Sequence, residues 1–464
     1  MNYLKDDTIA ALSTAVGKSA IAVIRLSGNE SFCIINKIFK THSKSEQRVK
    51  HGYIVDGIEK KDEVVCTFFK APHTYTGEDL VEISIHGNPV IINEVLNLTY
   101  KNGARPAEPG EFTYRSFLNG KIDLAEAEAV CALISSRTGI SAKAALNSMS
   151  GKLSLKVKNI RDSLIDLIAF MEVSLDHPDE DILFLPLNEK LSRLDSYIKG
   201  LQDLLNSYKT SKILQYGIKA VIIGKPNVGK SSLLNTILGK NRAIVTDIAG
   251  TTTDTIEETI DSYGIPLTIT DTAGIRTHTN TRNLIEFLGQ KKTKEIISEA
   301  DILVWLFDSS CKLDKNDLKI ANFLEKSNLN IPIVGILNKS DLRQKLSLDD
   351  VSESIKLNFF AFLSLSAKIG TGVEELLKEI DKFSGRSDDS KNDFLMINSR
   401  HYNLLQNALE SLIKTKQTLS TKKDADEIAC FEAVNAQVAL NEILGINVAE
   451  DILDTIFSTF CIGK

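Results

Sequence analysis

One stretch of eight residues constrains the fold of this chain more than any other: Gly224 to Ser231 read Gly-Lys-Pro-Asn-Val-Gly-Lys-Ser. An apolar run at 220–223 precedes it, and apolar residues at helical spacing follow from Ser232 to Leu238. Backbone N–H groups in such a loop converge on a phosphate at a helix N-terminus, where the helix dipole favours negative charge. The pattern predicts a nucleotide-binding loop in which Lys230 reaches the terminal phosphates and Ser231 ligates Mg²⁺. The loop residues expected against the nucleotide are Asn227, Val228, Gly229, Lys230, Ser231 and Ser232.

Three downstream motifs indicate which nucleotide is bound. Asp271-Thr272-Ala273-Gly274 follows a predicted strand, which puts a carboxylate near a hydrated Mg²⁺ and a glycine N–H near the γ-phosphate. Asn338-Lys339-Ser340-Asp341 follows the apolar run 331–337, and its Asp341 carboxylate suits the N1–H and exocyclic amine of guanine. The last motif, 364–368, is typical of the final base-contacting loop of a GTPase and contributes Ser366 and Ala367. In this order the motifs predict GTP.

Hydrolysis needs an oriented water and extra positive charge, which many GTPases take from a Gln after Asp-x-x-Gly and from an arginine finger. Here the residue after Gly274 is Ile275, which supplies neither. Asn227 and an oxygen-rich segment can instead hold a monovalent cation beside the phosphates. Thr251 or Thr252 of that segment is also expected to close on Mg²⁺ when the γ-phosphate is present, as switch loops do. The segment is Thr246, Asp247, Ile248, Ala249, Gly250, Thr251 and Thr252.

These motifs, together with the C-terminal Cys461-Ile462-Gly463-Lys464, resemble the MnmE (TrmE) family of tRNA-modification GTPases. The terminal tetrapeptide is the most family-specific element. The resemblance covers nearly the whole chain, because N-terminal segments agree as well. Those segments are Asp7 to Leu12, Val23 to Gly28, Tyr75 to Asp79, His86-Gly87, Pro109 to Thr113 and Asn119 to Lys121.

The resemblance implies GTP hydrolysis that depends on K⁺ and Mg²⁺, with G domains that dimerise across the nucleotide. It implies a homodimer that forms a heterotetramer with the flavoprotein MnmG. Together they would add a carboxymethylaminomethyl-type group to C5 of the wobble uridine (U34) of certain tRNAs. Carried over by position, the K⁺ ligands are Asn227, Thr246, Ile248 and Thr251, and the Mg²⁺ ligands are Ser231 and Thr252.

At two positions the role implied by the family has an alternative. Glu286, in Glu286-Phe287-Leu288-Gly289, matches the family's water-orienting acid, and the alternative is a solvated glutamate at a helix start. Thr253 stands where the family usually has arginine. Because arginine supplies a fixed charge and a bidentate donor, either the step it serves is weakened here or Arg276 or a neighbouring lysine substitutes.

The N-terminal segment carries a separate predicted site. Strands at 21–26, 64–69 and 80–85 and a helix at 89–100 predict a small α/β unit. The resemblance implies that it dimerises and binds a reduced folate, 5-formyl- or methylene-tetrahydrofolate. By position, the folate contacts are Arg25, Glu82, Lys121 and Lys464. Glu82 suits the pterin N–H pair, and the cations suit carboxylates. Cys461 beside them is a candidate nucleophile or redox-active thiol, with packing as the alternative.

Amphipathic periodicity at 153–175, 191–208, 402–419 and 431–460 predicts helices on both sides of the GTPase segment. The expected fold is therefore a multidomain α/β and α protein with a Ras-like P-loop GTPase domain inserted into a helical domain. Rotation of an inserted domain would move the helical frame, with 384–390 as the return hinge. The predicted domains are an N-terminal folate-binding and dimerisation domain at 1–120, helical parts at 121–213 and 383–464, and the G domain at 214–382.

Composition sets the remaining limits. The 464 residues are 43% hydrophobic and 25% charged, and they contain no apolar run that spans a bilayer and no signal peptide, so we expect a cytoplasmic protein without a membrane partner. Six scattered cysteines and seven histidines lack metal-binding spacing. The net charge of -6 does not indicate a nucleic-acid binder. One lysine cluster is a candidate tRNA contact, with a solvated helix end as its alternative: Lys414, Lys416, Lys422 and Lys423.

Two other function classes fit parts of the chain. A ribosome-assembly or regulatory GTPase of the Era or Der kind shares the phosphate-loop motif and the apolar residue after Asp-x-x-Gly. The N-terminal motifs and the terminal tetrapeptide argue against it. A scaffold with a vestigial GTPase is the other class, and the intact Lys230, Ser231, Asp271 and Asp341 argue against that.

Overall fold

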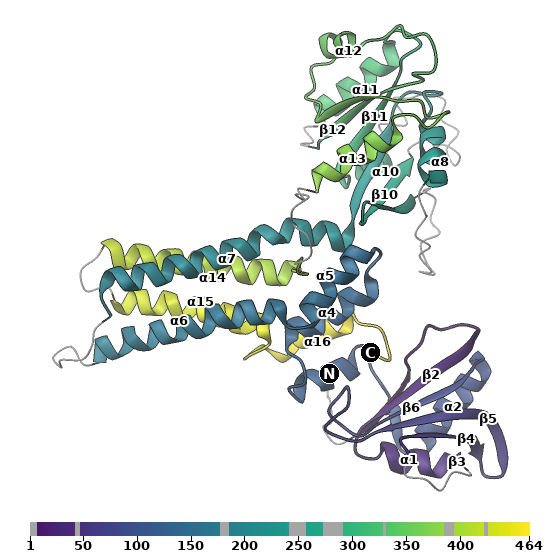
Figure 1. Ribbon diagram of the computed structural model, residues 1–464, viewed down its shortest axis with the longest axis vertical. Coiled ribbons are helices and arrows are strands. Elements are labelled where there is room, and N and C mark those ends of the chain that lie inside the picture. The colour runs from purple at the N-terminus through teal and green to yellow at the C-terminus, as the bar shows by residue number, and fades with distance from the viewer. Residues whose placement is uncertain are drawn as a thin grey trace. The chain divides into compact units, whose positions relative to one another are not determined.

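The computed structural model describes residues 7–41, 47–176, 185–240, 257–271, 291–327, 331–384, 394–421 and 426–464 (Figure 1). The chain divides into two compact units. The first unit comprises Met1–Cys131, Ser148–Gln202 and Asn403–Lys464, and the second comprises Ala132–Asn147 and Asp203–Tyr402. Each unit therefore contains segments that are far apart in the sequence.

The first unit holds a seven-stranded sheet whose order is β3-β4-β5-β6-β2-β1-β7. Helices α1 (Ser31–Ile38) and α2 (Pro89–Lys101) cover one face, where Ile24, Leu26 and Ile83 pack. Because side chains alternate along a strand, Arg25 and Glu82 face the other side. The strands are β1 (Thr8–Leu12), β2 (Ser19–Ser27), β3 (Phe39–Lys40), β4 (Val49–Asp56), β5 (Glu59–Phe69), β6 (Leu80–Gly87) and β7 (Ala104–Pro106).

The predicted strands at 21–26, 64–69 and 80–85 lie in β2, β5 and β6, and the predicted helix at 89–100 is α2. Asn88 caps α2 by accepting a hydrogen bond from Val90 N, and Pro89 occupies the first turn, where no N–H is needed. β1, β4 and α1 were not predicted.

Long helices form the rest of the first unit, and Figure 1 shows α6, α7, α14 and α15 running alongside one another. Tyr197 donates to Ser163 O at 2.9 Å between α7 and α6. The predicted run at 431–460 is divided between α15 and α16, because Gly445 (φ 83°) and Asn447 (φ 57°) interrupt it with left-handed backbone. The helices are α3 (Glu111–Leu118), α4 (Leu124–Ser135), α6 (Lys152–Asp176), α7 (Leu187–Tyr216), α14 (Ser399–Thr421), α15 (Asp426–Leu444) and α16 (Glu450–Ser458). Of these, α4 from Ala132, α7 from Asp203 and α14 up to Tyr402 belong to the second unit, as does α5 (Gly139–Met149) up to Asn147.

The second unit is built on a six-stranded sheet in the order β13-β12-β11-β8-β10-β9. β9 is antiparallel to β10, and the other neighbouring pairs are parallel. The carboxyl ends of the parallel strands therefore meet at one edge, where ligands bind in sheets of this kind. The strands are β8 (Ile218–Ile223), β9 (Glu257–Ser262), β10 (Ile265–Asp271), β11 (Ile302–Asp308), β12 (Ile333–Asn338) and β13 (Ala361–Ser364).

Helices bury both faces of this sheet. Leu233 and Leu377 lie in the core on one face, and Trp305 and Ile320 lie in the core on the other. Burial on both faces explains the continuous apolar runs of the parallel strands. Within the described part of the chain, no helix combines the length and apolar character needed to cross a bilayer. The helices are α8 (Lys230–Lys240), α10 (Lys291–Ser298), α11 (Lys315–Lys326), α12 (Leu348–Ser354) and α13 (Val373–Phe383).

Candidate nucleotide and ligand sites

The phosphate loop links β8 to α8 and depends on three left-handed residues. Gly224 has φ 150°, Asn227 has φ 60° and Gly229 has φ 102°. A Cβ on Gly229 would lie 2.3 Å from Asn338 Nδ2, and one on Gly224 would lie 2.8 Å from Leu306 O. Glycine is therefore required for both backbone conformation and space. The loop ends at the N-terminus of α8, which favours anions.

Lys230 closes this loop on itself. Its Nζ donates to Gly224 O at 3.0 Å and to Lys225 O at 2.9 Å, and the residue is 6% exposed. Ser231 and Ser232 follow in the first turn of α8, where Ser232 is exposed, as is Asn227. The ammonium group thus lies within the loop where a phosphate chain would be cradled.

Asn338 connects the phosphate loop to the predicted base loop. Its Nδ2 donates to Val228 O at 2.7 Å, and its Oδ1 accepts from Ala367 N at 2.9 Å. Asn338 is 2% exposed, so it joins two ligand-binding loops rather than presenting itself to a ligand.

Asp341 is presented as an acceptor at the same edge. Ser366 Oγ donates to it at 2.6 Å, and this hydrogen bond holds the pKa of the exposed Asp341 carboxyl below its usual value. Lys339 adopts φ 66°, and its ammonium group pairs with Asp308 at the end of β11. An ionised carboxylate fixed in this way suits the adjacent N–H groups of guanine. The role of Asp308 was not predicted, because no local motif marks it.

Several predicted residues are not described at side-chain level. The β10 strand ends at Asp271, in register with Ile222 of β8, so its backbone lies at the same sheet edge as the phosphate loop. The segments Thr246–Thr252 and Thr272–Gly274, Glu286, the substitution at Thr253, the side chain of Asp271 and the hinge residues 385–390 lie outside the described residues.

Arg25 and Glu82 form the centre of a second site on the open face of the N-terminal sheet. They are direct partners across β2 and β6, and Glu82 Oε1 accepts from Arg25 Nη2 at 2.7 Å and from Nε at 3.0 Å. The Arg25 guanidinium carbon lies 5.4 Å from the ring centre of Tyr75 and 5.6 Å from that of Phe112. Two aromatic walls thus enclose the ion pair. Their role was not predicted, although both lie in the family-like segments.

The C-terminal residues complete this site. Arg25 Nη1 donates to Gly463 O at 3.4 Å, and Lys464 Nζ lies 6.0 Å from the ring centre of Tyr75. Burial, together with the charge of Arg25, lowers the pKa of Lys464. Cys461 has an exposed side chain, and its carbonyl accepts from Gly110 N at 3.4 Å.

Lys121 belongs to the rim of the site. Its Nζ donates to Pro72 O at 3.0 Å, and its stem passes Gly77, so it contacts the loop that carries Tyr75. The structure thus brings Arg25, Glu82 and Lys464 together and places Lys121, which follows α3, against the loop that carries Tyr75.

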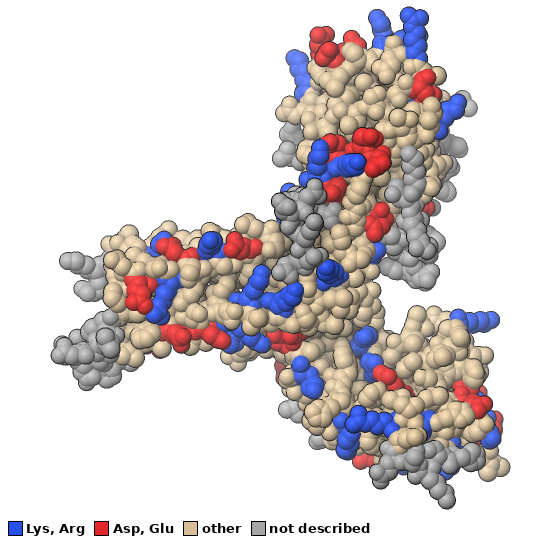
Figure 2. Space-filling view, in the orientation of Figure 1, with Lys and Arg blue, Asp and Glu red and all other residues tan. Residues whose placement is uncertain are grey.

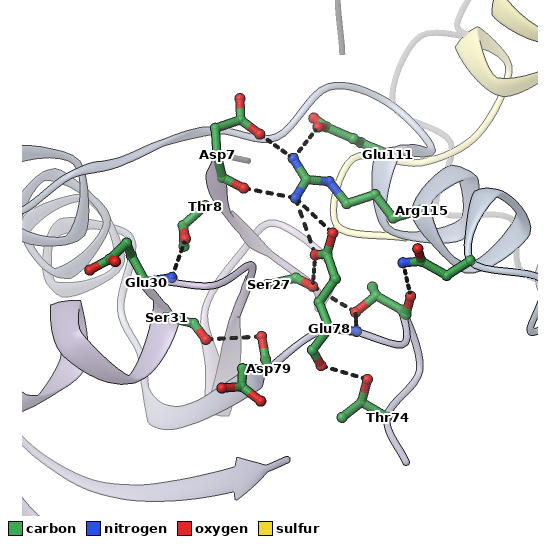
Figure 3. Close-up of polar contacts among 12 residues, drawn as sticks. Asp7, Thr8, Ser27, Glu30, Ser31, Thr74, Glu78, Asp79, Glu111 and Arg115 are labelled. Carbon is green, nitrogen blue, oxygen red and sulfur yellow. Dashed lines mark hydrogen bonds and ion pairs between the residues drawn. The ribbon is translucent and has the colours of Figure 1, made fainter. Parts of the chain in front are cut away.

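A network of charges centred on the buried Arg115 lies next to the aromatic walls, and Figure 3 draws the contacts of Arg115 with Asp7, Glu78 and Glu111. Arg115, which is 5% exposed, contacts Asp7 at 2.5 Å, Glu111 at 3.0 Å and Glu78 at 3.1 Å. Glu111 also pairs with Arg105, which in turn contacts Asp7. Because Glu78 lies on the Tyr75 loop and Glu111 precedes Phe112 in α3, the network fixes both walls through their neighbours. The sequence contains these residues within its motifs but gives no signal that they pair.

The strand order, the phosphate loop and the guanine-type loop define a GTP-binding protein of the P-loop GTPase class. Two family models match the chain: the MnmE helical domain over residues 124–461 and the GTP-binding protein TrmE N-terminus over residues 8–121. The chain belongs to the MnmE family of tRNA modification GTPases. The family resemblance inferred from the motifs is therefore confirmed. This decides against the Era or Der alternative.

The relatives carry the same family name. The tRNA modification GTPase MnmE of Endomicrobium trichonymphae is 73% identical over 464 residues, covering 100% of both chains. The MnmE proteins of Aquifex aeolicus and Alkaliphilus oremlandii are each 41% identical to this chain, and each match covers 99% of it. The match covers 100% of the Aquifex protein and 99% of the Alkaliphilus protein. Similarity along the full length means that the N-terminal, helical and GTPase parts are shared together.

Proposed function

We propose that this protein hydrolyses GTP and, together with the flavoprotein MnmG, adds a carboxymethylaminomethyl-type group to C5 of the wobble uridine (U34) of certain tRNAs. The observation that carries the proposal is the link from Val228 in the phosphate loop through Asn338 to Ala367, beside the ionised Asp341. This link joins a phosphate cradle to a guanine acceptor in a chain of the MnmE family.

GTP hydrolysis in this proposal depends on K⁺ and Mg²⁺. Lys230 contacts the terminal phosphates, Ser231 and Thr252 ligate Mg²⁺, and Glu286 orients the attacking water. The K⁺ ligands are Asn227, Thr246, Ile248 and Thr251. The exposed position of Asn227, in left-handed backbone within the phosphate loop, supports this assignment, because an amide oxygen there can face a bound cation. A cation there would supply the charge that Ile275 does not.

The N-terminal site is proposed to bind a reduced folate, which supplies a one-carbon unit when bound. Its residues fit that ligand: Glu82 is an acceptor for the pterin N–H pair, and the rings of Tyr75 and Phe112 lie near Arg25. Lys464, held at the same site, and Lys121 at the rim would pair with the glutamate carboxylates. Cys461 is the proposed thiol nucleophile.

The proposed assembly is a cytoplasmic homodimer that joins MnmG in a heterotetramer and acts on tRNA. In the proposed lysine cluster, Lys416 already pairs with Asp195. Lys422 and Lys423 lie outside the described residues. Figure 2 shows acidic and basic groups intermixed along the helices on the visible face. We therefore propose that MnmG provides most of the tRNA contact.

Two experiments test this function. GTP turnover by the purified protein should be much faster in K⁺ than in Na⁺ or Cs⁺, and Asn227→Ala should lose that preference. Nucleoside analysis of tRNA from a deletion strain should show loss of the C5 adduct, with recovery when the gene is restored. Equal turnover in all three salts would refute the K⁺ site, and an intact adduct would refute the tRNA function.

A further inference from the structure

Lys225, the second residue of the phosphate loop, points away from the phosphate cradle toward two carboxylates, the buried Asp317 and the exposed Asp314. Its Nζ donates to Asp317 Oδ2 at 2.8 Å and to Asp314 Oδ2 at 3.1 Å. Lys225 is 7% exposed and Asp317 is 1% exposed. A lysine and a carboxylate are rarely buried to this degree unless they are paired.

The two carboxylates are the capping box of α11. Asp314 accepts from the N–H groups of Asn316 and Asp317, and Asp317 Oδ2 accepts from Asp314 N at 3.1 Å. Lys225 therefore bridges both side chains that fix the start of this helix. Burial alone would lower the pKa of Lys225, but its hydrogen bonds to Asp317 and Asp314 outweigh burial and hold the pKa above its usual value. The ammonium group stays charged at neutral pH.

The main chain of Lys225 serves the phosphate loop at the same time. Its carbonyl accepts from Lys230 Nζ at 2.9 Å, and Pro226 and Asn227 follow directly. The side chain of Lys225 thus connects the first part of the phosphate-loop backbone to α11.

The segment from Asp308 to Asp317 also supports the base loop. Ser309 N and Oγ donate to Asn338 O at 3.0 Å and 2.7 Å, and Asp308 pairs with Lys339. One short segment therefore holds both nucleotide-binding loops, the phosphate loop through Lys225 and the guanine loop through Asn338 and Lys339.

We propose that Lys225 is a positioning residue for the nucleotide site: its contacts with the buried Asp317 and with Asp314 fix the phosphate loop, including Asn227, relative to the guanine loop. The inference rests on the proposed GTPase function and adds to it a residue that contacts neither the phosphates nor the base. Without the ammonium group, Asp317 keeps a buried carboxylate whose Oδ1 already lacks a hydrogen-bond partner among the described residues. The loop then loses its tie to α11.

The test compares three changes in the full-length protein. Lys225→Met removes the ammonium group, Lys225→Met with Asp317→Leu removes both charges, and Lys225→Arg keeps the positive charge. Replacing a buried ion pair with apolar groups often restores stability. The double variant therefore separates folding from positioning. Lys219→Met is the control. Lys219 lies on β8, the strand that leads into the phosphate loop, and it forms an exposed ion pair with Glu299.

Affinity for a fluorescent GDP analogue, the K⁺ concentration for half-maximal turnover and thermal unfolding are measured for each variant. We expect Lys225→Met to weaken GDP binding at least tenfold and to raise the K⁺ requirement. The double variant should regain thermal stability but not GDP affinity, and Lys225→Arg should recover most of the affinity. GDP binding by the double variant within twofold of the parent protein would overturn the inference, since the pair would then be structural only.

Hydrogen exchange without nucleotide separates this inference from the proposed function. Lys225→Met should speed amide exchange in the phosphate-loop peptide, whereas Lys219→Met should not. Unchanged exchange in Lys225→Met would refute the positioning role even if the parent protein hydrolyses GTP. Failure of the parent protein to bind GDP would instead refute the proposed function.

Discussion

Arg25 and Gly463 are 438 residues apart in the chain, and the Arg25 guanidinium donates to the Gly463 carbonyl at 3.4 Å. Residues near position 463 therefore form part of a site whose centre lies in β2. Gly463 has φ 89°, and a Cβ there would lie 2.1 Å from Leu12 O of β1. The C-terminal peptide thus packs against the sheet so closely that a side chain at this position has no room.

Gly463→Ala should consequently displace Lys464 from the site. We expect reduced-folate affinity to fall at least tenfold and tRNA modification to be lost, while GTP turnover changes less than twofold. Calorimetry with 5-formyl-tetrahydrofolate and a GTPase assay check the two parts.

Gly57→Ala is the matched control for this change. Gly57 has φ 62°, but no atom lies within 4 Å of the position that a Cβ would take, so it carries the left-handed strain of roughly 1 kcal/mol without the clash. Equal loss of folate affinity in both variants would show that strain, not displacement of the C-terminus, is responsible.

The charge network around Arg115 gives the N-terminal sheet a defined acid sensitivity. Burial would raise the pKa of Asp7, but hydrogen bonds from Arg105 and Arg115 outweigh it and hold that pKa below its usual value. Because the folded pKa is depressed, the stabilisation by Asp7 is present above the unfolded pKa and is lost as pH falls through the folded value. Asp7→Asn should lower the free energy of unfolding by about 1–2 kcal/mol at pH 7.

The difference between Asp7→Asn and the parent protein should shrink below about pH 4. Urea unfolding at pH 7, 5 and 3.5 measures it. Asp56→Asn, at an exposed carboxylate on β4, is the control and should leave stability unchanged at each pH. A difference that persists in full at pH 3.5 would mean that Asp7 does not act through its charge.

Local patterns were sufficient for the parts of the fold that depend on local chemistry. The phosphate loop was predictable because Gly224 and Gly229 meet backbone and steric demands that few residues satisfy. The long helices α6, α7 and α14 were predictable because their apolar residues repeat at helical spacing. The break after Leu444 was missed, since apolar periodicity continues through the left-handed Gly445.

Long-range pairing was not predictable from local patterns. Arg25 and Glu82 were placed in one site by family resemblance, but their cross-strand register appears only in the sheet. Tyr75 and Phe112 lie within the family-like segments, but no local pattern marks them or Arg115 as parts of the site. Their roles depend on contacts between distant segments, as with Arg115 and Asp7, which are 108 positions apart.

Asp341 gives the base preference a direct test. In Asp341→Asn an amide replaces the carboxylate that would accept from the guanine amine, so affinity for GTP should fall about a hundredfold. Affinity for xanthosine triphosphate should rise, because xanthine carries a carbonyl where guanine carries the amine. Competition against a fluorescent nucleotide measures both.

Asp349→Asn, an exposed carboxylate in the first turn of α12, is the control and should leave both affinities unchanged. Unchanged GTP affinity in Asp341→Asn would contradict the assignment of this residue to the base.

Labelling and substitution of Cys461 test whether its thiol takes part in the reaction or only packs. Its side chain is exposed, as is that of Cys33, whereas burial raises the pKa of Cys66 to about 12. A maleimide should therefore label Cys461 and Cys33 in the folded protein and leave Cys66 unlabelled, because the thiolate is the reactive form.

Cys461→Ser should abolish tRNA modification in a reconstituted reaction with MnmG, because a hydroxyl is a far weaker nucleophile than a thiol near neutral pH. GTP turnover should stay within about twofold, since Cys461 lies in the first unit and the phosphate loop in the second. Cys33→Ser should retain both activities, and nucleoside mass spectrometry follows the product. If Cys461→Ala modifies tRNA at the parent rate, the thiol has no chemical role, and the terminal tetrapeptide acts only through the packing of Gly463 and the charge of Lys464.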